Sequence, residues 1–549
     1  MGTGGKRRVV AVGLDSADYK LLRQWMDVGL LPNLAELFRS SAFGRLNGRS
    51  GYQAETPWTT TVTGCWPKTV GYWSPAHYLP SYKIEEAGAY DFSEYSPFYD
   101  YARDTDVIAF DVPHTRLHGR TRGIQIFAWG AHSPQGPSES TPPELLEEIN
   151  ARHGKHPALH SDDFCVSQTE GETDDLKRRL IKGVEQRTAA AIDLMRTRPW
   201  NLFITAYGEP HSAGHGFWHI SQKEHALYSI YGRDGVDPML EVYQAVDAAV
   251  AALRDAAPPD TYFVVFSQEG MKANSTDLPS WLFLPELLFR HSFNGRAAFA
   301  EGDAGSPPPA LRPLTQRNWM REVWALRTGN GLIDALDRRV RLRLSLYLDE
   351  LFRSGLRLLH PLKAGTFCSM PPMWYQPFWP HMQAFALPTF SDGYVRLNVK
   401  GRESAGIVEP ADYVSTREEI AGVISELKDP RTGKGMVREI MRTRTSPFDG
   451  DDEASYSDLI VLWTHEPTDV VDSPRYGRIG PAPYRRSGDH TAEGFFAVAG
   501  PDVRPGELPD GEIVDIAPTL LDMLATQKPN HFEGRSRIGE VLRGAPSYA

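Results

Sequence analysis

Residues 9–15 read Val-Val-Ala-Val-Gly-Leu-Asp, so six small or apolar residues run directly into a carboxylate. A short apolar run of this kind is typical of a strand that is buried on both faces of a parallel sheet. Helical periodicity follows in residues 21–38, and apolar runs alternate with helical segments further along the chain. The sequence therefore predicts an α/β protein with a mostly parallel central sheet flanked by helices.

The same patterns predict the individual elements. Further strands are expected at residues 107–110, 124–128, 202–206, 262–266, 394–399, 459–463 and 495–499. Helices are expected at residues 21–38 with an interruption at Pro32, and at residues 176–196, 239–253 and 515–524. Thr416 and Glu419 have the spacing of a capping box, which predicts another helix start there.

Residues 272–380 differ from the rest of the chain because they are rich in Pro, Trp, Phe and Arg. Within them, residues 302–313 are expected to form a loop, and residues 332–359 a basic, leucine-rich helix. We interpret 272–380 as a largely helical, aromatic-rich insertion or cap. Residues 1–271 and 381–549 would then form the metal-binding α/β domain. The aromatic residues of the insertion could cover a substrate, although core packing is their commoner role (Trp374, Tyr375, Phe378 and Trp379).

The composition limits the partners of the protein. The formal net charge of the 549 residues is -11, which argues against a nucleic-acid partner and fits a protein that handles small molecules. The three cysteines, Cys65, Cys165 and Cys368, are too few for a disulfide framework, so a reducing, cytoplasmic location is expected. No stretch approaches the roughly 20 apolar residues of a membrane span, so no membrane partner is expected. The oligomeric state stays open.

Several polar residues follow predicted strands, where α/β proteins build their sites. Asp15 ends the first strand and could be a ligand or a helix N-cap. Glu269 follows the strand at 262–266 and could equally be an exposed turn residue. His211 and His215 are four residues apart, so on a helix they would share one face and could bind one metal ion. They could also be ordinary loop residues.

Two further segments carry candidate groups. His490 precedes the last strand, and Gly488 beside it leaves room for a close backbone approach. Residues 55–64 hold five threonines, and a hydroxyl near a divalent metal ion can act as a nucleophile. Strand propensity and helix capping explain most threonines of this kind, so at most one or two of them can be catalytic.

Together these segments resemble the alkaline phosphatase superfamily, most closely its type I phosphodiesterase/nucleotide pyrophosphatase branch. The resemblance covers roughly residues 8–75, 105–275 and 380–540, and it implies an alkaline phosphatase-like fold. The segments that carry it, in chain order, are residues 12–15, 31–34, 63–64, 209–215, 267–271 and 488–494.

The resemblance also implies roles for single residues. Thr56 would be the nucleophile, with Thr59 and Thr60 as alternatives, and His215 and His490 would bind the first metal ion. Asp15 and Glu269 would bind a second one. The chain departs from the family pattern at His211, where the family usually has Asp, and at Gln268-Glu269, where it has Asp-His.

These departures bear on the cofactor. Three histidines with an open coordination position suit a catalytic zinc ion, and imidazole also suits iron, copper or nickel. The oxygen-rich second site could favour magnesium or manganese, or stay empty. We therefore expect one or two divalent ions, with zinc in the first site.

The resemblance implies a metal-dependent hydrolase that acts on a phosphate ester or phosphodiester, for example a nucleotide-like or other small anionic substrate. Arg478 and Arg486 could hold the substrate's anionic group. Two alternatives remain. A redeployed enzyme of the same fold could catalyse group transfer or lyase chemistry in specialised metabolism, or the chain could be a non-catalytic binding protein.

Overall fold

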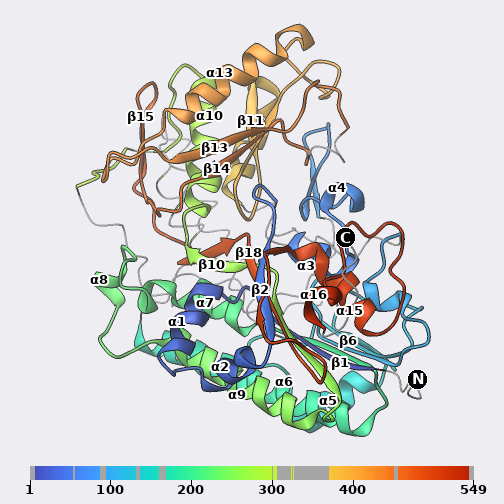
Figure 1. Cartoon of the computed structure of the whole chain (residues 1–549). Coiled ribbons are helices and arrows are strands. Elements are labelled where there is room, and N and C mark those ends of the chain that lie inside the picture. The colour runs from blue at the N-terminus through green and yellow to red at the C-terminus, as the bar shows by residue number, and fades with distance from the viewer. Residues whose placement is uncertain are drawn as a thin grey trace. The chain divides into compact units, whose positions relative to one another are not determined.

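The structure is a computed structural model of the whole chain (Figure 1). It describes residues 7–52, 56–86, 94–130, 137–159, 169–299, 301–305, 319, 323, 326, 370–450 and 455–542.

The chain forms two compact units. The first comprises Met1–Trp73, Gly88–Asn274 and Arg486–Ala549, and the second comprises Ser74–Ala87 and Ser275–Arg485. Residues 381–485, which the sequence analysis assigned to the α/β domain, belong to the second unit. The interpretation of residues 272–380 as an insertion or cap stays a prediction.

A ten-stranded sheet forms the centre of the first unit, and its main strand order is β19-β2-β18-β9-β1-β8-β5-β6-β7, with β20 paired to β2. Strands β9, β1, β8, β5 and β6 are parallel to one another, whereas β18 and β7 run antiparallel to their neighbours. The predicted mostly parallel sheet is therefore confirmed. The strands are β1 (Arg8–Leu14), β2 (Ala42–Asn47), β5 (Val107–Phe110), β6 (Gly123–Phe127), β7 (Glu139–Thr141), β8 (Leu202–Tyr207), β9 (Thr261–Ser267), β18 (Glu493–Ala499), β19 (Gly506–Glu507) and β20 (Gly511–Glu512).

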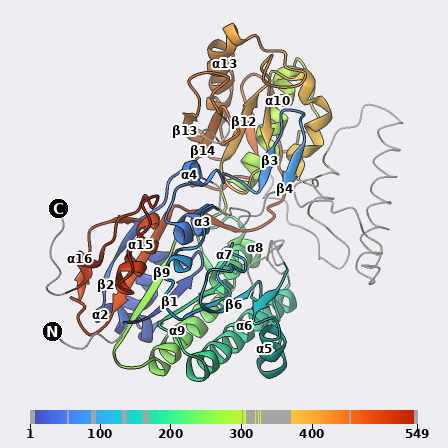
Figure 2. The same ribbon diagram turned by 90° about the vertical axis from the view of Figure 1, so that its right-hand side faces the viewer.

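Helices cover both faces of this sheet (Figures 1 and 2). Val10, Val12 and Leu14 of β1 belong to a buried apolar cluster with residues of α1, α2, α6, α7 and α9. Gly13, which alternates with them, faces Trp58 of α3 on the other side. The helices of the unit are α1 (Tyr19–Asp27), α2 (Pro32–Arg39), α3 (Thr56–Thr63), α4 (Pro67–Val70), η1 (Phe98–Tyr101), α5 (Leu145–His153), α6 (Glu170–Thr197), α7 (Glu209–Ser221), α8 (Tyr228–Tyr231), α9 (Pro238–Ala256), η8 (Ile513–Asp515), α15 (Ile516–Met523) and α16 (Ile538–Val541).

Local sequence signals explain several helix starts. The side chain of Asp18 accepts a hydrogen bond from the Leu21 amide and caps α1. Pro32 begins α2, as the predicted interruption requires. Thr169 and Glu172 form a capping box at the start of α6.

The second unit contains an antiparallel four-stranded sheet of order β11-β12-β14-β13. Its described elements are β3 (Ala76–Tyr78), β4 (Ile84–Glu86), η2 (Pro279–Phe283), α10 (Leu284–Ser292), η6 (Pro371–His381), β11 (Ala384–Leu387), β12 (Gly393–Leu397), η7 (Pro410–Asp412), α13 (Tyr413–Ser425), β13 (Val437–Arg442), β14 (Leu459–Trp463), β15 (Val471–Ser473) and β16 (Gly477–Ile479). The predicted helix at residues 332–359 lies outside the described residues, as does most of the predicted loop at residues 302–313.

One local prediction in the second unit is wrong. Thr416 and Glu419 do not form a capping box, because α13 already begins at Tyr413, after a 3-10 turn that starts at Pro410. Thr416 is buried inside the helix. The helix starts earlier because Pro410 supplies a backbone angle that suits a helical turn.

Aromatic residues of η6 pack within the second unit. The ring of Phe378 lies 5.2 Å from that of Phe289, and Trp379 stacks on Phe385 with ring centroids 4.5 Å apart. Core packing, the commoner role considered for these aromatic residues, therefore accounts for both. Among the described residues, no helix is long and apolar enough to span a lipid bilayer.

Candidate metal centre

Three neighbouring parallel strands, β9, β1 and β8, deliver polar residues to one edge of the sheet. Asp15 directly follows β1, and its amide donates a hydrogen bond to the carbonyl of Tyr207 at the end of β8. Gln268 and Glu269 directly follow β9. Because the carboxyl ends of parallel strands meet at the same edge, residues far apart in the chain become neighbours there.

Helix α7 starts just beyond β8 and carries the His-x-x-x-His motif. It spans Glu209–Ser221, so His211 and His215 lie one turn apart on the same face. Their Nε2 atoms are 3.2 Å apart, and their ring centroids are 4.5 Å apart. Of the two alternatives that the sequence left open, a helix or a loop, the structure has the helix.

His490 reaches the same place from a short pair of antiparallel strands that are far apart in the chain. Strands β10 (Gly270–Ala273) and β17 (Gly488–Thr491) are antiparallel, and Met271 pairs with His490. His490 therefore lies on a strand, a position that the sequence analysis did not foresee. A Cβ atom at Gly488 would lie 2.2 Å from the carbonyl oxygen of Gly214, so the close backbone approach expected at Gly488 is confirmed.

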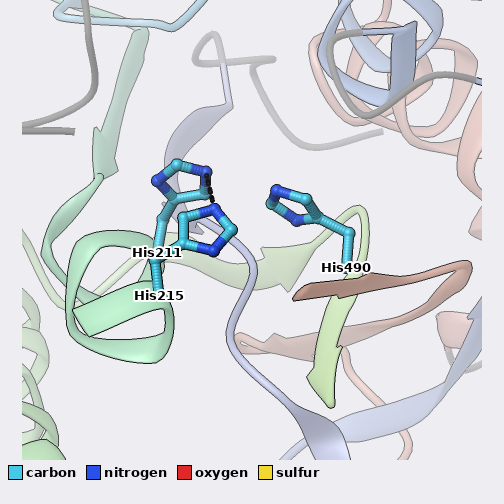
Figure 3. Close-up of side chains that lie close together, drawn as sticks. All are labelled: His211, His215 and His490. Atoms are coloured by element: carbon cyan, nitrogen blue, oxygen red, sulfur yellow. Dashed lines mark hydrogen bonds between the residues drawn. The ribbon is translucent and has the colours of Figure 1, made fainter. Parts of the chain in front are cut away.

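The three imidazoles form one cluster (Figure 3). One ligand atom from each of His211, His215 and His490 lies within 4.8 Å of the others. The ring of His490 is stacked on that of His211 at 5.0 Å and lies edge-on to that of His215 at 4.8 Å. Rings from a helix and from a strand therefore converge on a common point.

Two of the three rings are fixed by hydrogen bonds at Nδ1. In His215 this atom lies 2.8 Å from the carbonyl oxygen of Gly488, which can only accept a hydrogen bond. In His490 it lies 3.2 Å from Oε1 of Glu269. An Nδ1–H that donates outward leaves Nε2 of each ring as the atom with a lone pair, which is how metal-binding histidines are oriented.

The protonation of the cluster follows from its surroundings. Burial and the positive charge of Arg486 hold the pKa of His215 well below its ordinary value. Burial alone would lower the pKa of His490 too, but the charge of Glu269 and its hydrogen bond raise it. His215 is therefore neutral near pH 7, in the form that binds a metal ion.

Asp15 lies beside the cluster and is completely buried. Its Oδ1 atom accepts hydrogen bonds from the indole Nε1–H of Trp58 and from Nε2 of Gln268, both at 2.7 Å. The hydroxyl of Ser16 donates to Oε1 of Glu269 at 2.8 Å. The buried carboxylates are thus stabilised by donors of the chain itself.

The candidate nucleophile Thr56 is the first residue of α3 and is 1% exposed. Trp58, two residues later, links this helix to Asp15. The alternatives Thr59 and Thr60 are also buried in α3. The choice among the three hydroxyls stays a prediction.

The two arginines expected to hold the substrate lie in different units. Nη1 of Arg486 lies 3.0 Å from Nε2 of His215 and can only donate a hydrogen bond to it, so this guanidinium borders the imidazole cluster and a metal ion at that nitrogen would displace it. Arg478 belongs to the second unit, where it forms a bidentate ion pair with Asp472 at 2.7 and 2.9 Å. A substrate-binding role for either residue stays a prediction.

The sequence analysis missed a buried ionic cluster at the start of α7. His156 lies 2.8 Å from Glu209, and Arg187 lies 3.6 Å from Glu209 and 2.7 Å from Asp111. Burial would raise the pKa of Glu209, but Arg187 and His156 hold it below its ordinary value. An arginine on the apolar face of the long helix α6, beside Ala190 and Ala191, was the available signal.

Several solved structures are distantly similar to the chain. Human ectonucleotide pyrophosphatase/phosphodiesterase 5 is 11% identical at a TM-score of 0.48, with 98% of this chain and 100% of that chain covered. An inactive form of the murine protein in complex with AMP is 12% identical at a TM-score of 0.47, with the same coverage. Phosphonoacetate hydrolase from Sinorhizobium meliloti 1021, in complex with phosphonoformate, is 12% identical at a TM-score of 0.47, covering 95% of this chain and 96% of that one. No curated protein matches the chain by sequence.

Buried imidazoles and carboxylates gathered at the carboxyl edge of a mostly parallel sheet are typical of an α/β enzyme. The model of the type I phosphodiesterase / nucleotide pyrophosphatase family matches residues 9–300, more than half of the 549 residues. The chain belongs to this family, so the resemblance found in the sequence is confirmed. The protein is therefore an enzyme of a family that hydrolyses phosphoesters.

Proposed function

We propose that the protein hydrolyses a phosphate ester or phosphodiester of a small anionic substrate. A divalent metal ion would be held by His211, His215 and His490, and Thr56 would be the nucleophile. Members of this family depend on divalent metal ions. The observation that carries the proposal is the convergence of one ligand atom from each of the three histidines within 4.8 Å.

The donor set fits a zinc-like ion. Two nitrogens that share a tetrahedral zinc ion at about 2.0–2.1 Å lie about 3.3 Å apart. The Nε2 atoms of His211 and His215 are 3.2 Å apart, which is close to that spacing. When bound, such an ion supplies Lewis acidity toward a phosphoryl oxygen and lowers the pKa of a nearby hydroxyl.

The residues around the cluster support the remaining roles. Thr56 is the first residue of helix α3, and the helix dipole favours an anionic group at this end. Its hydroxyl would lose its proton and attack phosphorus, and the leaving oxygen would depart on the opposite side and take up a proton. Water would then cleave the phosphothreonine, which releases the phosphate product and regenerates Thr56. Arg486 would hold a non-bridging oxygen through charge-assisted hydrogen bonds. Glu269 would keep the ring of His490 in its orientation through the contact at Nδ1.

The proposal is tested with three matched threonine variants on aryl phosphate mono- and diesters. Thr56→Val should abolish hydrolysis, whereas Thr56→Ser should keep part of it because a hydroxyl remains. Thr61→Val is the control, because the Thr61 hydroxyl is buried in the same helix without a hydrogen-bond partner. Equal activity of Thr56→Val and Thr61→Val would reject Thr56 as the nucleophile.

Two finer expectations remain predictions. Zinc is the ion we expect on the basis of the imidazole ligands, and a cytoplasmic location is expected from the low cysteine content.

Transfer to an acceptor other than water is the second candidate reaction. Hydrolysis in ¹⁸O-labelled water distinguishes it, because only hydrolysis places label in the released phosphate.

A further inference from the structure

The residues that would surround a second metal ion are Asp15, Gln268 and Glu269, and each already has a partner in the chain. Oδ1 of Asp15 accepts two hydrogen bonds of 2.7 Å, from Trp58 and from Gln268. Oε1 of Glu269 accepts one of 2.8 Å from Ser16. All of these side chains except that of Glu269, which is 3% exposed, are 0–1% exposed.

The chemistry of these donors does not suit a cation. An indole Nε1–H can only donate a hydrogen bond, so Trp58 directs a proton at Asp15. Gln268 directs its amide N–H at the same oxygen, while its Oε1 atom is buried without a hydrogen-bond partner. Turning the amide would instead place Oε1 of Gln268 at 2.7 Å from Oδ1 of Asp15, and an amide oxygen cannot donate a hydrogen bond. These residues therefore do not fit a second ion.

Glu269 has a different task in this arrangement. Its Oε1 atom lies 3.2 Å from Nδ1 of His490, and the Ser16 hydroxyl lies 3.2 Å from that same nitrogen. A carboxylate that accepts the Nδ1–H of a ligand histidine fixes the orientation and tautomer of the ring. Glu269 thus supports the imidazole cluster and is a positioning residue.

We infer that this chain holds a single transition-metal ion at His211, His215 and His490. Hydrogen bonds from Trp58 and Gln268 take the place of a second ion beside Asp15. The inference rests on the proposed metal site and deepens it. Three imidazole nitrogens suit zinc, cobalt, nickel or copper, whereas magnesium and manganese prefer oxygen ligands. The protein should therefore be insensitive to magnesium.

The packing of Trp58 in the first unit fixes its position. Its hydrogen bond to Asp15, which takes the place of a second metal ion, is therefore a fixed feature of the structure. A Cβ atom at Gly13 would lie 2.6 Å from Cη2 of Trp58, so β1 needs a glycine where the indole crosses it. The Trp58 ring also meets Phe266 at the end of β9 with centroids 5.9 Å apart. The indole therefore packs against residues of the neighbouring strands β1 and β9, with its N–H toward Asp15.

The test is a titration of the metal-depleted full chain with Co²⁺, followed by its d–d absorption and by elemental analysis of the dialysed protein. The wild-type protein should bind one equivalent. Asp15→Asn should still bind one, since an amide oxygen can accept the bonds of Trp58 and Gln268. The double variant Gln268→Asp, Glu269→His should bind two equivalents, because it restores anionic and imidazole ligands.

The outcomes separate this inference from the proposed function. Two equivalents in the wild-type protein, with one lost in Asp15→Asn, would overturn the single-ion inference and leave the proposed hydrolase intact. A single ion that survives His211→Ala but is lost in Asp15→Asn would overturn the three-histidine site. No binding by the wild-type protein would overturn both. A double variant that binds only one ion would overturn the assignment of Gln268 and Glu269 as the cause.

Discussion

Nη1 of Arg486 lies 3.0 Å from Nε2 of His215, the ring nitrogen that also faces His211. Arg486 is 8% exposed, and Nη2 of its guanidinium lies 3.9 Å from Oδ1 of Asp489. A cation in this position borders the place where a metal-bound anionic substrate would sit. In the proposed function this guanidinium would stabilise negative charge on the substrate.

We predict that Arg486→Gln lowers kcat/KM for a phosphodiester by about 10- to 100-fold, the effect of losing one charged hydrogen bond worth about 1.5–3 kcal/mol. The bound metal should remain, which elemental analysis checks. Arg485→Gln is the matched control, because the neighbouring guanidinium lies 5.0 Å from the Trp281 ring. Equal losses in the two variants would argue against a specific role for Arg486.

Glu269 should control metal affinity through His490. Glu269→Ala removes the acceptor 3.2 Å from Nδ1 of His490 and should weaken Co²⁺ binding by about 10- to 100-fold. Glu493→Ala is a suitable comparison, because Glu493 is exposed and pairs only with Lys20 at 3.3 Å among the ion pairs of the described residues. Unchanged Co²⁺ affinity in Glu269→Ala would show that this carboxylate does not position the ligand.

The ionic cluster of Arg187, Glu209, Asp111 and His156 at the start of α7 should stabilise the folded protein. Arg187→Met leaves the buried carboxylate of Glu209 and the partly buried one of Asp111 without their cation, and we expect a loss of about 3–5 kcal/mol in the free energy of unfolding. Arg178→Met, on the same helix, removes an exposed pair with Asp175 and should change it by no more than about 1 kcal/mol. Urea unfolding measures both values, and similar losses would refute the prediction.

Burial of His225 should make the free energy of unfolding depend on pH. Burial lowers its pKa to about 4 from the ordinary 6.5, so the unfolded chain takes up the proton first as the pH falls. The stability is therefore fully present above about pH 6.5 and decreases below it, by about 2 kcal/mol down to about pH 5. Urea unfolding of His225→Gln at several pH values should no longer show this decrease in the free energy of unfolding. A pH dependence identical to that of the wild-type protein would contradict the prediction.

Local patterns in the sequence predicted most of the first unit. The run at residues 9–15 specifies β1 because a buried parallel strand needs continuous apolar residues, and Asp15 ends it where the sheet edge begins. The four-residue spacing of His211 and His215 specifies one helix face. Helix α13 shows the limit, since Pro410 starts the helical turn ahead of the apparent capping box at Thr416.

Contacts across long sequence separations could not be predicted in this way. The hydrogen bond from Gln268 to Asp15 joins residues 253 positions apart, and the one from Trp58 depends on where α3 crosses β1. Both depend on the packed sheet, and neither residue type signals such a role by itself. The same holds for Arg187, whose partners come from a strand end and from the start of α7.

The most direct test of the central claim is X-ray absorption spectroscopy at the zinc edge of the zinc-loaded full chain. Three imidazole nitrogens at about 2.0–2.1 Å, with the multiple scattering of imidazole rings, are the predicted result. His219→Gln should leave this spectrum unchanged, since His219 hydrogen-bonds Ser487 outside the cluster. A ligand shell with fewer than three imidazoles, or one made of carboxylate oxygens, would contradict the account.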